Sequence, residues 1–270
     1  MQANPDTLGE FLRARREQLS PQQAGLPGGE RRRVPGLRRE EVAMLAGVSV
    51  EYYLRLEQGR DLHPSDQILD GIAAALQLDD DAVAYLHRLA HPAPRGHRRR
   101  KRPQPAGAGL QQLIDNWTHT PAYAQATTGQ VVAANRLAVA LSPFFAVGSN
   151  TLRAAFLEPA MRQLYPDWED MTAKAVSSLR AMLSLDAAEP GLLETIGELT
   201  VASERFATLW ARRDVRAKTA GLTRFDHPVA GRLELNYEKL LQPEARQLLV
   251  VYHAAPGSPS AERLQLLASL

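Results

Sequence analysis

Residues 92–108 divide the chain into two parts that must fold around separate cores. This stretch combines four prolines with an arginine-rich run at 95–102, and such a composition cannot build a hydrophobic core. The chain has 270 residues, which suits two domains because a typical domain has roughly 100–200 residues. We therefore expect an N-terminal domain over 1–91, a basic linker over 92–108 and a second domain over 109–270.

The N-terminal part has the pattern of five short helices. Thr7 and Glu10 have the spacing of a capping box, which predicts a first helix over 7–19. Prolines and glycines predict a loop over 20–36. Helix starts and stops then predict four more helices, at about 37–46, at 50–58, from Pro64-Ser65 onward, and from the acidic cluster 79–81 to His91.

The second part mixes helical and strand patterns. Two short strands are expected within 123–134, with a turn at Thr128-Gly129, and further strands at 231–237 and 248–252. Helices are expected at 109–117, 135–141, 150–165, 167–185, 190–199, 202–212 and 259–268. This order lacks the regular alternation of a doubly wound sheet, so the sequence predicts an α+β fold behind an all-α N-terminal domain.

Residues 37–60, LRREEVAMLAGVSVEYYLRLEQGR, have the spacing of a helix-turn-helix. The small Ala43 suits the point where the second helix crosses the first, and Gly47 suits the turn between them. The outward face of the second helix then presents Val50, Glu51, Tyr52 and Arg55 to a major groove. The alternative is a plain helical hairpin in a bundle. The surrounding helices and the flanking arginine clusters favour DNA binding.

Residues 7–91 resemble the lambda-repressor-like, Xre-type helix-turn-helix domains. The matching segments are 39–43, 46–49 and 53–59, and the long loop before them departs from the compact pattern. The resemblance implies a phosphate contact for Arg39, and flanking arginines such as Arg60 are expected to bind phosphates, so that binding weakens with salt. It also implies that one set of residues faces DNA: Ser49, Val50, Glu51, Tyr52 and Arg55.

Two of these residues carry distinct chemical expectations. Arg55 can donate two hydrogen bonds to a guanine. Glu51 can accept a hydrogen bond from a cytosine amino group. Its alternative role is to interact with the dipole of its own helix in the first turn, and the sequence leaves both roles open.

Residues from about 110 to 267 resemble the MmyB-like ligand-binding domain of actinobacterial regulators. The matching segments occur in one order: 120–123 (TPAY), 134–135 (AN), 150 with 156–157 (N and FL), 164–168 (LYPDW), 203, 206 and 210 (S, F and W), 214–215 (DV), 227–228 (HP), 231 (G) and 255–258 (APGS). The resemblance implies a PAS-like α+β domain and an apolar, fatty-acid-type ligand. Val229 and Ala230 stand where the family tends to carry an acidic residue, which weakens any role for an acid there.

Aromatic and polar residues of this second part are the candidate ligand contacts, because such pockets are mainly apolar with a few polar anchors. A carboxylate ligand favours an arginine partner. For each aromatic the alternative is a place in the core, and for the histidine a place in a turn. The candidates are Tyr123, Asn135, Phe156, Trp168, Arg205, Phe206, Trp210 and His227.

Several classes of site are excluded or disfavoured. The chain has no cysteine, which removes disulfides, thiolate nucleophiles and cysteine-ligated metals. The GxSxG, HExxH, GxxxxGK[ST] and GxGxxG motifs are absent, so we expect no enzyme active site and no bound cofactor. His87 and His91 are four residues apart and could share a helix face, but they lie at a helix end with no third ligand nearby, so we expect no metal site. No signal peptide or membrane span is expected, and a cytoplasmic location follows.

The sequence therefore predicts a DNA-binding transcriptional regulator that acts as a homodimer on double-stranded DNA. Its second domain is expected to bind a small apolar effector. The main alternative is a second domain that serves only for dimerisation or protein interaction, without a ligand. An enzyme fused to a DNA-binding domain is a third reading.

Overall fold

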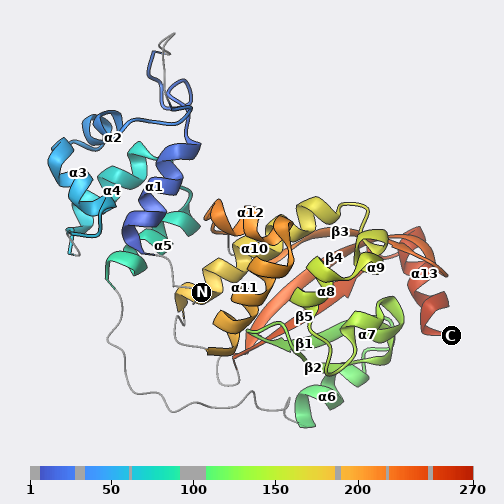
Figure 1. The fold of residues 1–270 in the computed structure, drawn as a ribbon. Coiled ribbons are helices and arrows are strands. Elements are labelled where there is room, and N and C mark those ends of the chain that lie inside the picture. Colours follow the sequence, from blue (N-terminus) through green and yellow to red (C-terminus); the bar gives the residue numbers. More distant parts are fainter. Residues whose placement is uncertain are drawn as a thin grey trace.

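The computed structural model describes residues 7–27, 34–60, 63–91, 108–185, 190–216, 219–242 and 246–269. They form a helical N-terminal unit (residues 7–91) and an α+β C-terminal unit (residues 108–269), seen side by side in Figure 1. The α+β class is confirmed. The expected linker at 92–108 lies, apart from its last residue, outside the described residues. No described helix is both long and apolar enough to cross a membrane.

The N-terminal unit has the five helices that the sequence predicts, with ends shifted by one or two residues. Thr7 closes the predicted capping box with Glu10, the Ser49 hydroxyl accepts a hydrogen bond from the Tyr52 N–H, and Gly47 takes the left-handed conformation at φ 68°. The helices are α1 (Leu8–Gln18), α2 (Arg39–Ala46), α3 (Val50–Glu57), α4 (Asp66–Ala75) and α5 (Asp80–Ala90).

A single buried cluster holds these helices together. Phe11 and Tyr85 join α1 to α5 with their ring centroids 5.1 Å apart. Helix α1 also lies very close to the end of α3, because a Cβ at Gly9 would stand 2.3 Å from the Glu57 carbonyl oxygen. The fully buried side chains include Phe11, Leu12, Leu37, Val42, Tyr53, Leu56, Leu69, Ile72 and Leu86.

The C-terminal unit is built on one antiparallel sheet with the strand order β2-β1-β5-β4-β3. Its strands are β1 (Ala122–Ala126), β2 (Val131–Ala134), β3 (Ala220–His227), β4 (Gly231–Gln242) and β5 (Gln247–His253). Its helices are α6 (Ala108–Asp115), α7 (Arg136–Leu141), α8 (Thr151–Leu157), α9 (Pro159–Leu164), α10 (Trp168–Leu185), α11 (Pro190–Ala202), α12 (Glu204–Ala211) and α13 (Pro259–Ala268), with a 3-10 turn at Pro143–Phe145.

Three expectations for this unit are corrected. The sequence did not predict β3, whose polar residues, such as Arg224 and Asp226, mask the strand pattern. The helix expected at 150–165 is two helices, α8 and α9, because Pro159 cannot donate the hydrogen bond that would continue α8. Strand β4 also extends five residues past the predicted end at 237.

The two faces of the sheet have different cover. One face carries alternate residues from each strand, such as Tyr123, Leu235 and Tyr252, into the main core beneath α7, α8 and α9. The other face packs Ala122, Ala124 and Leu249 against Ile114 of α6. A separate cluster around Phe206 and Leu179 joins α10, α11 and α12.

The N-terminal unit docks on the C-terminal unit through α1 and α5. Helix α5 packs beside α10, and both Ala181 of α10 and Val215 belong to the N-terminal buried cluster. The segment that follows α12 adds polar contacts, in which Asp214 pairs with Arg15 at 2.8 Å and Arg213 with Glu10 at 3.4 Å. The two units therefore share a packed interface.

Candidate DNA-reading helix and ligand cavity

Helix α3 presents its expected residues on one outward surface. Ser49, Glu51, Arg55 and Arg60 are exposed, and Val50 is 36% exposed. Tyr52 is half-buried, with its ring centroid 5.3 Å from the Arg55 guanidinium carbon. In Figure 1, α3 lies on the side of the N-terminal unit away from the C-terminal unit. The expected reading surface is therefore accessible.

A buried carboxylate fixes the base of this surface. Glu57, at the end of α3, has only 2% of its side chain exposed and binds Arg16 of α1 and Arg39 of α2. The Arg39 Nε donates to a Glu57 oxygen at 2.7 Å, and Arg16 also donates to the Leu37 carbonyl. Arg39 keeps 43% of its side chain exposed. This network fixes the positions of three helices relative to one another.

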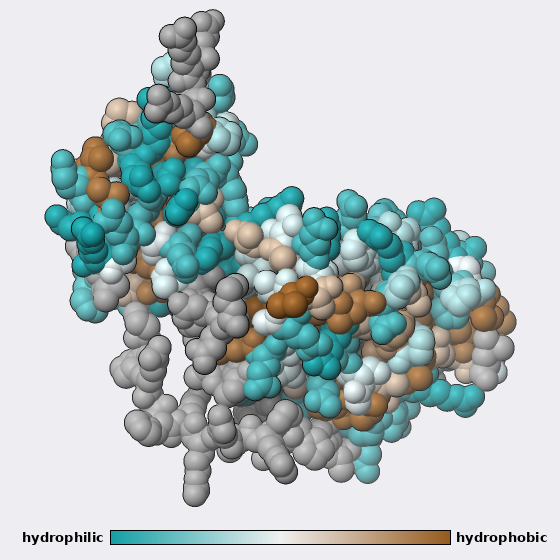
Figure 2. Space-filling model, viewed as in Figure 1, coloured by the Kyte–Doolittle hydropathy of each residue, from teal (hydrophilic) through white to brown (hydrophobic). Residues whose placement is uncertain are grey.

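The surface of the N-terminal unit shown in Figure 2 is mostly hydrophilic, with a few separate hydrophobic groups. Exposed Met44 and Leu45 lie on α2, next in sequence to the turn. A polar surface with exposed arginines is the type that binds the phosphate backbone.

A cavity of about 450 Å³ lies over the inner face of the sheet. Its floor consists of alternate residues on neighbouring strands. The register places Tyr123 of β1 opposite Val250 of β5, and Val250 opposite Lys239 of β4. Helices α8, α9 and α10 form its walls with Leu152, Ala155, Met161, Met171, Leu179 and Met182.

Part of the wall comes from the N-terminal unit. Asp81, Ala84 and Arg88 of α5 also line the cavity, which agrees with the packing of α5 on α10. The cavity is therefore bounded by both units.

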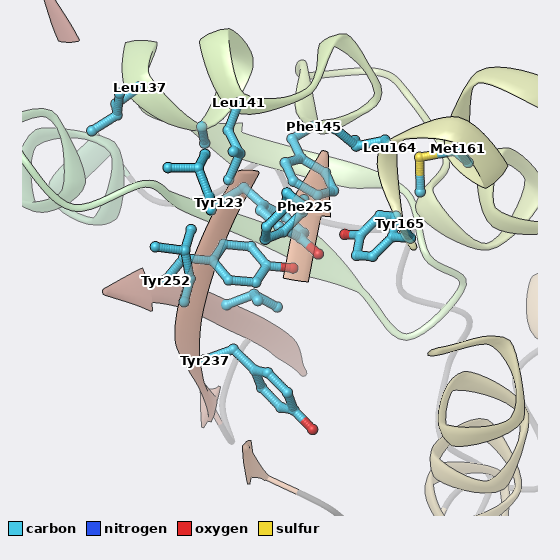
Figure 3. Packing of buried hydrophobic residues seen from close by; sticks show 14 of the residues in the cluster. Tyr123, Leu137, Leu141, Phe145, Met161, Leu164, Tyr165, Phe225, Tyr237 and Tyr252 are labelled. Carbon is cyan, nitrogen blue, oxygen red and sulfur yellow. The ribbon is translucent and has the colours of Figure 1, made fainter. Parts of the chain in front are cut away.

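Three tyrosine hydroxyls meet above the sheet, as Figure 3 shows. Tyr123 and Tyr165 are both hydrogen-bonded to Tyr252. Burial raises the pKa of each of the three hydroxyls above its ordinary value. The group thus supplies polar but uncharged partners among apolar walls.

Glycine at position 221 is needed for the shape of this floor. The register pairs Gly221 of β3 with Tyr237 of β4, and a Cβ at 221 would stand 2.9 Å from the Tyr237 hydroxyl oxygen. The tyrosine ring therefore lies over the glycine, at the side of the cavity that Tyr237 lines.

Family comparisons cover both units. The helix-turn-helix domain model matches residues 7–86, and the model of the MmyB-like transcription regulator ligand binding domain matches residues 106–267. The chain belongs to the MmyB-like transcription regulators. No curated protein matches it. The chain is thus a DNA-binding transcription regulator with a ligand-binding domain, and both matched families are regulatory.

In this MmyB-like domain, Tyr123 is the one predicted ligand contact that lines the described cavity. Asn135 instead caps α7 and is buried, where its side-chain amide donates to the carbonyls of Ile114, Trp117 and Thr120. His227 accepts hydrogen bonds at Nδ1 from the N–H groups of Val229 and Ala230, and its Nε2 lies 2.9 Å from the Ala140 carbonyl. Asn135 and His227 therefore hold nearby backbone segments in place through hydrogen bonds and do not line the cavity.

The remaining predicted contacts pack helices of the MmyB-like domain. The Trp168 indole donates to the Ala155 carbonyl, and Arg205 donates to the Glu169 carbonyl at 2.7 Å. Phe206 stacks on Trp210 with the ring centroids 5.8 Å apart, and its ring meets Phe156 edge-on. The structure thus places these five residues around α10 and α12, beside the cavity lining rather than in it.

Sequence reasoning missed the cavity's charged residues, which are the acids Asp81, Asp167 and Asp170 and three bases. Lys174 and Lys239 come from α10 and β4, and Arg88 comes from α5. Side chains two residues apart on a strand share a face. The sequence could therefore have predicted that Lys239 lies on the same inner face as Tyr237. The contribution of α5 had no sequence signal, because it depends on how the two units dock.

The histidine pair of α5 has a neighbour that the sequence did not reveal. Asp66 of α4 lies 3.3 Å from the Nδ1 of His87 and 3.8 Å from the Nδ1 of His91, and Asp70 lies 2.9 Å from the Nε2 of His87. The expectation that no third potential ligand lies nearby is wrong, because α4 packs beside α5. The arrangement links the two helices through polar contacts at the surface.

Proposed function

We propose that this regulator binds double-stranded DNA through α3 and that a small apolar effector in the cavity controls its affinity for DNA. The observation that carries the proposal is the shared lining of the cavity. Residues of the ligand-binding domain form its floor and walls, and Asp81, Ala84 and Arg88 of the DNA-binding domain complete it. A ligand there would touch both domains at once.

The effector class follows from the size and lining of the cavity. Its volume of about 450 Å³ falls within the roughly 300–1,000 Å³ of typical ligand sites. Most of its wall is aliphatic or aromatic, including Phe145, Leu152, Met161 and Leu179. These features support a fatty-acid-like ligand with an extended apolar part. A PAS-like arrangement of this domain stays a prediction that the five-stranded antiparallel sheet supports.

The segment between α12 and β3 supports a coupling route from the cavity to the DNA-binding domain. At one end Arg212 accepts a hydrogen bond from Gln18, and Asp214 pairs with Arg15. At the other end Thr219 lines the cavity, and its carbonyl accepts the Lys239 N–H. A ligand changes DNA affinity only if it binds the two domain arrangements unequally, and the described residues of this segment contact both α1 of the DNA-binding domain and the cavity.

The DNA-bound form is proposed to be a homodimer. One helix of eight residues offers few base contacts, and two such helices about 34 Å apart read two half-sites on the same face of the duplex. Arg55 is the proposed base reader, whereas Arg39 and Arg60 would hold phosphates. Native mass spectrometry of the freshly purified protein tests both parts, because it reports the dimer and any bound small molecule.

The substitution Ala84→Trp tests whether α5 is part of the ligand site. Ala84 is exposed on its helix and lines the cavity, so a larger side chain should block the site without disturbing the core of its own domain. Dodecanoate at 100 times its dissociation constant should stabilise the wild type by about 2.7 kcal/mol and the variant much less. Ala74→Trp, at an exposed position of α4 outside the lining, is the matched control.

The outcomes separate the two claims. If neither dodecanoate nor dodecanol stabilises the wild type, the apolar effector is wrong and a ligand-free dimerisation module is favoured. If dodecanoate stabilises Ala84→Trp as much as the wild type, α5 is not part of the ligand site.

A further inference from the structure

Lys239 places an amine inside a cavity whose lining is mainly apolar but also includes Asp81, Arg88, Asp167, Asp170 and Lys174. It lies on β4 between Tyr237 and Leu241, which share its face of the sheet, and all three residues line the cavity. Its Nζ is 5.4 Å from the centroid of the Tyr237 ring. Its side chain is half-buried. Lys239 pairs with Val250 of β5, the central strand of the sheet, and so lies beside the centre of the cavity floor.

This amine has no acidic partner among the described residues. Lys239 forms no ion pair with another described residue. Lys174, the other lysine of the cavity, binds Asp170, which lies one helical turn before it. Burial and the nearby charge of Lys174 both lower the pKa of Lys239. A partly buried cation without a counterion is unfavourable, and an anion supplied by a ligand would relieve this.

The same cavity also offers a different kind of polar group. Tyr123, Tyr165 and Tyr252 present hydroxyls that are hydrogen-bonded to one another and stay neutral. They can bind an alcohol or an ester as well as an acid. They therefore do not select for charge, whereas an ammonium group does.

We infer that Lys239 binds the acidic headgroup of the effector, so that the effector is an amphiphile with one carboxylate or phosphate and an apolar chain. The chain then extends along the floor toward Tyr123, Phe145 and Met161. This inference rests on the proposed function, because it assigns the headgroup and the orientation of the ligand in the same cavity. It also replaces Arg205 as the expected anion partner, since Arg205 lies outside the lining.

The test compares ligands of equal chain length in the full-length protein. Dodecanoate, dodecyl phosphate, methyl dodecanoate and dodecanol are titrated by calorimetry into the wild type and Lys239→Met. The wild type should bind the acids about tenfold more tightly than dodecanol, as expected for a charge-assisted contact. Lys239→Met should lose this preference and keep its affinity for dodecanol. Tighter binding of the phosphate than of the carboxylate would identify a phosphate-bearing amphiphile.

Three further variants keep the result specific to this amine. Lys239→Arg retains the charge and should retain the preference for acids. Lys174→Met makes the same chemical change at the lysine already bound to Asp170 and should affect the preference less. Tyr252→Phe removes a hydroxyl of the tyrosine group, where the inference places the apolar chain, and should leave the preference for acids unchanged.

Two results would overturn the inference. One is equal affinity of the wild type for dodecanoate and dodecanol. The other is an acid preference that survives in Lys239→Met. If this preference then disappears in Tyr252→Phe, the headgroup lies at the tyrosines. If none of the four probes binds the wild type, the proposed function itself fails, and this inference fails with it.

Discussion

The guanidinium of Arg15 lies 2.8 Å from a carboxylate oxygen of Asp214 and so ties α1 of the DNA-binding domain to the segment that leads into β3. Arg15 has 20% of its side chain exposed and Asp214 has 46%. An ion pair of this exposure contributes little to stability, typically about 0.2–1 kcal/mol. Its position between the two domains suggests that it matters for their coupling.

We therefore predict that Arg15→Ala and Asp214→Ala each reduce the effect of dodecanoate on DNA affinity and leave dodecanoate binding unchanged. The reason is that both substitutions loosen the contact between α1 and the segment without touching the cavity. The double variant with exchanged charges, Arg15→Asp with Asp214→Arg, should restore part of the effect. The effect of dodecanoate on DNA affinity is measured by fluorescence anisotropy. The DNA is a site that the protein has selected from a random pool. An unchanged ligand effect in both alanine variants would remove this pair from the coupling route.

Arg55→Ala should weaken specific DNA binding by about 1–3 kcal/mol, the value of one good bidentate base contact. Arg55 is exposed on α3, so the free energy of unfolding should change by less than about 0.5 kcal/mol. Binding to the selected site and to random DNA is compared at one salt concentration. Arg232→Ala, an exposed arginine of β4, is the control. Equal losses on specific and random DNA would make Arg55 a phosphate contact.

Glu57→Ala should destabilise the DNA-binding domain by about 3–5 kcal/mol. The substitution leaves Arg16, with 7% of its side chain exposed, without its buried carboxylate partner, and breaking a buried ion pair has this magnitude. Urea unfolding followed by circular dichroism measures the change. Arg13→Ala removes the exposed pair with Glu17 on α1 and should cost less than about 1 kcal/mol. Similar effects for the two variants would contradict the role given to Glu57.

Stability should depend on the charge of Glu10 at acid pH. Burial raises the pKa of Glu10, but the hydrogen bonds from Thr7 and the nearby Arg213 charge outweigh it, so the pKa lies below its ordinary value of 4.5. A lowered pKa means that the stabilisation is present above the ordinary pKa and is lost as the pH falls through the folded-state value. The advantage of the wild type over Glu10→Gln should therefore shrink as the pH falls below about 4.5. A constant difference between pH 7 and the acid range would contradict this.

Local signals sufficed to predict most helices. The capping box of Thr7, the turn at Gly47 and the cap at Ser49 each specify a boundary within a few residues of itself, and the structure has all three. The turn at Gly129, with φ 85°, likewise joins the two predicted strands. Strand β3 escaped prediction because its alternation is broken by polar residues that face outward at the sheet edge.

The ligand cavity could not be predicted in the same way. Its lining joins residues far apart in sequence, from Asp81 to Tyr252, and their meeting depends on strand order and on domain docking. The aromatic residues Phe206 and Trp210 have the appearance of pocket residues in the sequence, yet they form a second core with α10 and α11. A single sequence cannot distinguish these two fates for an aromatic side chain.

The central claim is that the cavity and the DNA-reading helix are coupled through α5, and a reciprocal binding measurement tests it most directly. The affinity of the full-length protein for its selected DNA site is measured with and without saturating dodecanoate, and the affinity for dodecanoate with and without DNA. The account predicts that both affinities change by the same factor, as linkage requires, and that this factor approaches one in Ala84→Trp. Dodecanoate that binds in the cavity while DNA affinity stays unchanged would contradict the account.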